Sequence, residues 1–169
     1  RKNRTSVAVL KGDEPEEKLR LLEDDIMTYY GLGCRNVSKV FVPEGYDFIP
    51  LLRSLEDKGK QMVENHKYNN NYDYNKSIYL VNRVEHLDNG YLLLTKSEQL
   101  VSPISVLYYE TYQSLEALQE TFKELSDKLQ CVVSSEAFFP NSIPFGQAQH
   151  PDIADYADDV DTMAFLASL

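Results

Sequence analysis

The chain has 169 residues, of which 43% are hydrophobic and 26% charged, and its formal net charge is −10. These proportions are typical of a globular protein with one hydrophobic core, whereas the acidic balance disfavours nucleic acid or an anionic membrane surface as the main partner. No apolar run approaches the roughly 20 residues that a membrane span needs, and no secretory signal opens the chain, so we expect a cytoplasmic protein.

The first third of the chain alternates between strand-like and helix-like patterns. Asp13 and Glu16 have the spacing of a capping box, and Gly31 is a typical helix terminator. The pattern predicts, in order, a buried strand over 6–10, an amphipathic helix over 14–30, a β-branched strand over 37–42 and a second helix over 46–58. A strand, a helix and a strand within about 40 residues favour an α/β layer architecture.

The remaining elements are less regular. The Asn- and Tyr-rich tract over 65–76 fits either a loop or a helix that starts with an Asn cap. We then predict strands over 77–82 and 91–95 separated by a turn at 88–90, a strand over 104–109, a helix over 114–128, a strand over 129–134, a stretch with few signals over 136–151 and an amphipathic segment over 152–169. No repeat or linker divides these elements, so residues 1–169 form one domain in this interpretation. The start at Arg1, directly before a strand, suggests a piece of a longer protein.

The candidate for chemistry is Cys34, which follows two glycines at a helix end and precedes a buried strand. Such a junction exposes a side chain, and Gly33 allows a substrate to approach the backbone. Arg35 and Lys39 could favour the thiolate that attacks a carbonyl carbon, although the negative end of the helix dipole opposes this. A free cysteine is more often a small buried hydrophobe, and this is our interpretation of Cys131 within its apolar strand.

The segment around Cys34 resembles the active-cysteine signature of the aldehyde dehydrogenase superfamily, F-x-x-x-G-Q-x-C-x-x-x-x-R-x-x-V. Gly31, Cys34 and Lys39 match in register, while Leu32 replaces the glutamine. Three further segments resemble family motifs in the same order, at 4–10, 98–103 and 144–146. The residues at 33–38 and the ending after 145 look most like long-chain acyl-CoA reductases related to the bioluminescence fatty-acid reductase.

The resemblance implies a three-layer αβα domain with a mostly parallel sheet, of the aldehyde dehydrogenase catalytic-domain type. It implies that Cys34 attacks an acyl-CoA thioester, that CoA leaves, and that NAD(P)H reduces the enzyme thioester to an aldehyde. The Cys34 N–H would be one oxyanion donor. The second donor and most of the nucleotide site would belong to an upstream nucleotide-binding domain, and the family usually forms homo-oligomers.

The same resemblance assigns secondary roles. Gln99, with Glu98 beside it, stands where the family holds the nicotinamide ribose, although polar turn residues would look the same. Phe145 would line the acyl pocket, although aromatic residues are more often core. His150 follows the segment that approaches the substrate channel, although a surface or cap histidine would look the same. The histidines and cysteines show no metal-like spacing, so no metal site is predicted, and the aspartates over 152–161 are expected to form a solvated helix face.

Three hypotheses remain open from the sequence. The first is an acyl-CoA reductase domain that acts through Cys34. The second is an aldehyde-oxidising dehydrogenase, which would need a general-base glutamate that, by register, lies before Arg1. The third is a non-catalytic α/β module for interaction or oligomerisation, in which Cys34 has ordinary reactivity.

Overall fold

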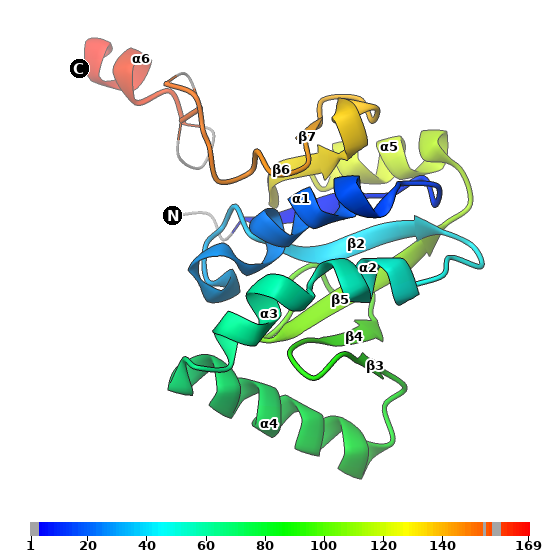
Figure 1. Cartoon of the computed structure of the whole chain (residues 1–169). Coiled ribbons are helices and arrows are strands. Elements are labelled where there is room, and N and C mark those ends of the chain that lie inside the picture. Colours follow the sequence, from blue (N-terminus) through cyan, green and yellow to red (C-terminus); the bar gives the residue numbers. More distant parts are fainter. Residues whose placement is uncertain (1–3, 154, 157–159) are drawn as a thin grey trace.

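The computed structural model describes residues 4–153, 155–156 and 160–169, and a seven-stranded sheet runs through it (Figure 1). The strand order is β3-β4-β5-β2-β1-β6-β7, and every neighbouring pair is parallel except β3 with β4. The strands are β1 (Thr5–Val9), β2 (Val37–Pro43), β3 (Leu87–Asp88), β4 (Leu93–Lys96), β5 (Val106–Tyr112), β6 (Leu129–Ser134) and β7 (Ile143–Pro144). The expectation of a mostly parallel sheet is confirmed.

Helices cover both faces of this sheet, which gives the three-layer αβα architecture (Figure 1). They are α1 (Glu16–Met27), α2 (Ile49–Ser54), α3 (Glu56–Met62), α4 (His66–Asn82), α5 (Leu115–Glu124) and α6 (Thr162–Ala167), with 3-10 turns η1 (Thr28–Gly31) and η2 (Ser135–Ala137). The helices α1 and α2 share one core with the sheet face that carries Val40 and Leu107. On the other face, α5 packs on Phe41 and α4 packs on Tyr108.

The predicted strand over 77–82 is wrong, because these residues form the end of α4. The side chain of Asn65 accepts a hydrogen bond from the Tyr68 N–H at 3.1 Å and so caps the helix, which decides between the two alternatives for the tract over 65–76. Tyr68, Tyr72 and Asn75 then bury one face of α4. This burial overrides the local β-propensity of the following residues.

Other helix boundaries differ from the predicted ones. The segment expected as one helix over 46–58 forms two short helices that meet at Leu55. The capping box is absent, because Pro15 is the N-cap of α1 and makes no side-chain cap. The carboxylate of Glu14 instead accepts hydrogen bonds from the backbone N–H groups of Lys11 and Gly12. Glu14, which lies one residue before the N-cap Pro15, therefore orders the loop that precedes α1 and does not cap the helix.

The C-terminal segment leaves the body of the domain, and α6 lies away from the sheet (Figure 1). The helix covers only Thr162–Ala167, so the amphipathic helix expected over 152–169 is much shorter than predicted. Asp158 and Asp159 of the acidic run lie outside the described residues, and Asp161 is the N-cap of α6. Among the described residues, no helix has the length and apolar character required to cross a membrane.

Candidate active site

Cys34 lies on the turn between η1 and β2, and it is exposed. Strands β1, β2, β5 and β6 are parallel, so their amino ends meet at one edge of the sheet, and the turn lies at this edge. Among the described residues, no group accepts a hydrogen bond from the Cys34 N–H. The Cys34 side chain is therefore open to a ligand, and the Cys34 N–H has no acceptor within the described part of the chain.

The turn owes its shape to Asn36, which is buried although it lies only two residues after Cys34. The Asn36 Nδ2 donates hydrogen bonds to the backbone carbonyls of Asp25, Ile26 and Thr28, at 3.1, 3.3 and 2.8 Å. Its Oδ1 accepts a hydrogen bond from the Gly33 N–H at 2.8 Å. These carbonyls belong to the end of α1, so the amide offsets part of the negative helix end that lies close to Cys34.

Sequence reasoning missed Asn36. The sequence does place Asn36 just after a helix end, where an Asn amide can donate to backbone carbonyls that have no partner within the helix. Gly33 is fixed by the same contact, because a Cβ on Gly33 would lie 2.9 Å from the Asn36 Oδ1. The glycine therefore has a structural role in the turn. Whether it also borders the substrate stays a prediction.

The hydroxyl of Ser6 links Cys34 to Cys131. It donates to the Cys34 carbonyl at 3.0 Å and accepts from the Cys131 N–H at 3.1 Å. Cys131 is half-buried and lines a cavity, so the interpretation of a plain core cysteine is wrong. Burial raises the pKa of the Cys131 thiol, while Arg35 and the Ser6 hydroxyl lower it. The exposed thiol is therefore at Cys34 and the shielded one at Cys131.

The two cations that could have favoured a Cys34 thiolate bind other groups. Arg35 donates through Nε to the Ala148 carbonyl at 2.8 Å and forms an ion pair with Asp155 at 3.3 Å. Lys39 is only 1% exposed and forms an ion pair with Glu110 on the sheet face that carries α5. Arg35 holds the turn against the C-terminal segment, whereas Lys39 belongs to the sheet.

Glu98 and Gln99 are exposed on the loop between β4 and β5. They line a cavity of about 700 Å³ whose wall includes Lys39 and Glu110. The Ser38 hydroxyl donates to the Leu100 carbonyl at 2.6 Å, which joins this loop to β2 close to the Cys34 turn. Carboxylate and amide oxygens in such a cavity have the acceptors that a ribose diol requires.

Phe145 and His150 differ in their burial. Phe145 is 3% exposed and belongs to the core under α1, while His150 is exposed. Neither residue lines the cavity that Cys131 borders or the cavity that Gln99 borders. Their predicted substrate roles stay predictions.

Asp25 is a second residue that the sequence did not reveal. It is fully buried, and its carboxylate accepts hydrogen bonds from the N–H groups of Gly146 at 2.7 Å and Ala148 at 2.9 Å. Burial raises its pKa to about 6, against the lowering effect of the two N–H groups. Asp25 thereby fixes the segment around Phe145 to α1. Within the described part of the chain, no three His, Cys, Asp or Glu side chains are grouped as a metal ion would need.

No protein-family model and no curated protein matches the sequence. Solved structures do match the fold. An indole-3-acetaldehyde dehydrogenase in complex with NAD+ has a TM-score of 0.52 and 8% identity over 82% of this chain. An NAD-dependent aldehyde dehydrogenase from Sinorhizobium meliloti has a TM-score of 0.50 and 10% identity over 83%. The Δ-pyrroline-5-carboxylate dehydrogenase from Mycobacterium tuberculosis has a TM-score of 0.50 and 14% identity over 79%.

The chain has the α/β fold that is present in part of these aldehyde dehydrogenases, as the sequence motifs predicted. It covers 34% of the first two structures and 30% of the third, so it spans about a third of their length. At these identities the likeness concerns the fold.

Proposed function

We propose that the chain is the cysteine-bearing domain of an NAD(P)H-dependent acyl-CoA reductase, in which Cys34 forms a thioester with the acyl group. The observation that carries the proposal is the Cys34 turn. The exposed Cys34 side chain lies beside its own backbone N–H, which has no acceptor among the described residues. A buried asparagine holds this turn by four hydrogen bonds. A fixed turn of this kind positions a nucleophile.

The chemistry follows from these two groups. The Cys34 thiolate attacks the carbonyl carbon of an acyl-CoA, and the Cys34 N–H donates a hydrogen bond to the oxyanion. The carbon–sulfur bond to CoA breaks, CoA leaves as a thiolate, and the acyl group stays on Cys34. A nicotinamide cofactor, when bound, would supply the hydride that releases the acyl group from Cys34 as an aldehyde. Glu98 and Gln99 are the residues of this chain that would hold its ribose, and the rest of its site would lie in an upstream nucleotide-binding domain.

A second candidate function is the oxidation of an aldehyde by NAD+. Structures with the same fold are described as aldehyde dehydrogenases, and one of them is in complex with NAD+. The first step is attack by the same thiol in both functions. The two functions differ in how the Cys34 thioester forms and how it is consumed. In the reductase it would form from acyl-CoA with loss of CoA and be reduced by hydride to an aldehyde, whereas in the oxidising enzyme it would form by loss of hydride to NAD+ and be hydrolysed by water to a carboxylic acid. A non-catalytic module with this fold is the third possibility.

Acyl transfer from a CoA thioester tests the proposal in the intact protein. Dodecanoyl-CoA should add one dodecanoyl group to Cys34, and peptide mass spectrometry locates it. Cys131→Ser should be acylated as the wild type is, and Cys34→Ala should not be. Acylation of Cys131 alone, or full reductase activity in Cys34→Ala, would refute the role of Cys34. Release of a free carboxylic acid from an aldehyde and NAD+, without any CoA-dependent step, would favour the oxidising function.

A further inference from the structure

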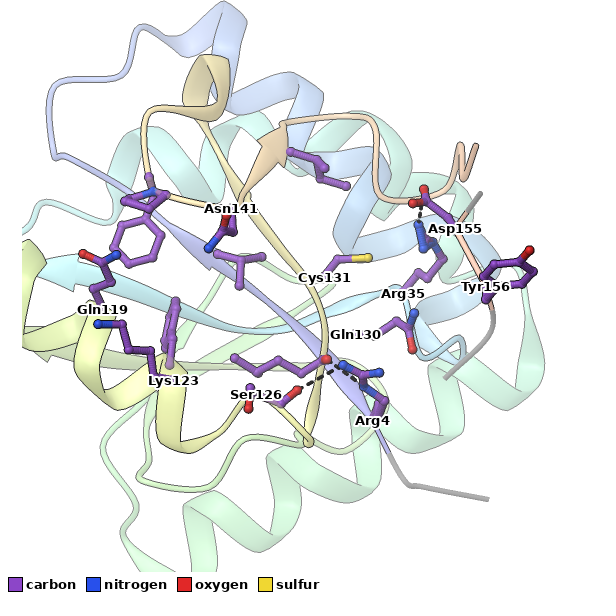
Figure 2. Close-up of a pocket in the computed structure, with 16 residues that line it drawn as sticks. Arg4, Arg35, Gln119, Lys123, Ser126, Gln130, Cys131, Asn141, Asp155 and Tyr156 are labelled. Carbon is purple, nitrogen blue, oxygen red and sulfur yellow. Dashed lines mark hydrogen bonds and ion pairs between the residues drawn. The ribbon is translucent and has the colours of Figure 1, made fainter. Parts of the chain in front are cut away.

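A second cavity, of about 500 Å³, lies beside α5 and has no role in the proposed reaction (Figure 2). Its walls come from α5, β6, the loop before β7 and the start of the C-terminal segment. Cys34 does not line it, whereas Cys131 does. Its volume lies within the roughly 300 to 1,000 Å³ that small-molecule sites occupy.

Part of the cavity wall is apolar. Phe122 and Phe139 belong to the core under α5 and contact each other at 5.3 Å between ring centroids. Leu129, Val132 and Ile143 line it further. Such a surface gains free energy when an apolar chain displaces water from it. The cavity therefore suits a ligand with a hydrocarbon part.

One end of the cavity is polar and carries a positive charge. Figure 2 shows Arg35, Gln130 and Arg4 together at this end, with Gln119 and Lys123 at the other. The Arg35 guanidinium is held by the Ala148 carbonyl through Nε, which leaves its remaining N–H groups to bind an acceptor. A guanidinium matches the two oxygens of a carboxylate or a phosphate.

Two observations indicate that an oxyanion belongs at this end. Asp155, from the C-terminal segment, already places a carboxylate oxygen 3.3 Å from the Arg35 guanidinium, although its own side chain is 51% exposed. The Oε1 of Gln130 is buried without a hydrogen-bond partner among the described residues. Because this oxygen is buried, the Nε2 of the same amide is the atom that can face a ligand, and its N–H groups would donate to an oxyanion.

We propose that this cavity binds an organic oxyanion with an apolar chain, and that the anionic head takes the place of Asp155 at Arg35. A fatty carboxylate and an alkyl phosphate share this chemistry. The chain of the ligand lies over Phe122 and Phe139, and its head lies between Arg35 and Gln130. The exposed Asp155 is then a weak internal competitor, because an exposed ion pair contributes little.

Binding of dodecanoate to the full chain tests the proposal by calorimetry. Dodecanol lacks the charge and acetate lacks the chain, so each should bind at least about tenfold more weakly. Dodecyl phosphate distinguishes a phosphate head from a carboxylate head by its affinity relative to dodecanoate. Arg35→Gln should weaken dodecanoate binding about tenfold, the effect of a lost charge-assisted hydrogen bond.

A matched pair of variants tests whether the Asp155 carboxylate competes with the ligand for Arg35. Asp155→Asn should tighten dodecanoate binding about two- to fivefold, because it removes the carboxylate at Arg35. Asp152→Asn makes the same charge change in the same segment and should leave the affinity unchanged, since within the described residues the ion pair of Arg35 is with Asp155 and not with Asp152. Equal tightening in both variants would indicate a general charge effect and would overturn the assignment of the head to Arg35.

The two cysteines supply an independent readout. Bound dodecanoate should slow the alkylation of Cys131, which lines the cavity, and leave that of Cys34 unchanged. Protection of Cys34 alone, or no saturable binding at all, would overturn the proposal. A failure of Cys34 to accept an acyl group would leave this result unaffected, because the cavity readout does not depend on the reaction of Cys34.

Discussion

The carboxylate of Asp25 on α1 accepts a hydrogen bond from the Gly146 N–H, 121 residues away along the chain, at 2.7 Å. Asp25 also holds Ala148, whose carbonyl in turn accepts from the side chain of Arg35. One buried acid thus joins α1 and the segment after β7, and Arg35 continues the connection to the Cys34 turn. The first prediction concerns the charge of this acid.

We expect Asp25 to make the stability of the protein depend on pH in the acidic range. The pKa of Asp25 is about 6 in the folded state, against an ordinary value of 3.8 that applies to the unfolded chain, so the folded state binds the proton more tightly. The contribution is fully present below about pH 3.8 and is lost as the pH rises through about 6. A shift of about two units corresponds to roughly 3 kcal/mol.

Urea unfolding of the wild type and of Asp25→Asn, across this pH window, measures the effect. The wild type should lose unfolding free energy between the two pH values relative to the variant, which has no titrating group at this position. At neutral pH the variant still leaves Gly146 or Ala148 without an acceptor, at a cost of about 1 to 3 kcal/mol. If the unfolding free energies of the two proteins changed with pH in parallel, Asp25 would not have the raised pKa.

Asn36→Asp should destabilise the protein severely. The substitution keeps the acceptor for the Gly33 N–H but places a carboxylate oxygen against three backbone carbonyls. We expect a loss of about 3 kcal/mol or more at neutral pH, measured by urea unfolding. Asn71→Asp is the matched control, because the Asn71 amide makes one bond to the Lys67 carbonyl on the exposed side of α4. Its effect should stay within about 0.5 kcal/mol.

The ion pair between Lys39 and Glu110 should respond differently to the loss of each partner. Lys39 is 1% exposed and the Glu110 side chain is 40% exposed. Glu110→Ala leaves a buried ammonium without its counter-ion and should cost about 3 kcal/mol, whereas Lys39→Met removes the buried charge and should cost less than about 1 kcal/mol. Thermal unfolding of the two variants measures the difference. Equal losses would show that the pair acts as an exposed one.

Iodoacetamide should modify Cys34 well before Cys131 at neutral pH. Cys34 is exposed, while burial raises the pKa of Cys131 and so keeps its thiol protonated. We expect a rate ratio of at least about ten, which should fall as the pH is raised and Cys131 ionises. Labelled peptides separated by mass spectrometry give both rates. Faster modification of Cys131 at neutral pH would contradict the contrast between the two thiols.

The sequence predicted the elements whose burial follows a simple period. The apolar run of β1 and the β-branched run of β2 lie where alternation and composition placed them, as does the helical spacing of α5. It failed over 77–82, where tertiary burial of Tyr72 and its neighbours decides for helix. Local propensity contains no information on that contact.

For the candidate site, the structure tests only where the residues lie and how exposed they are. The sequence located Cys34 on an accessible turn after a helix end, and the structure confirms this position. Asn36 and Asp25 could not be found in the same way, because their partners are backbone groups that periodicity does not identify. The partner of Asp25 lies across the fold, and that of Asn36 depends on how the chain turns after α1.

Ser6 adds a consequence for the evolution of this domain. Its hydroxyl accepts a hydrogen bond from the Cys131 N–H and donates one to the Cys34 carbonyl, so one side chain of β1 sets the spacing between the Cys34 turn and β6. Insertions or deletions in the surrounding loops need not disturb that spacing, since the reference point belongs to the sheet. The placement of the Cys34 turn therefore depends on a small hydroxyl group that takes no part in the proposed chemistry.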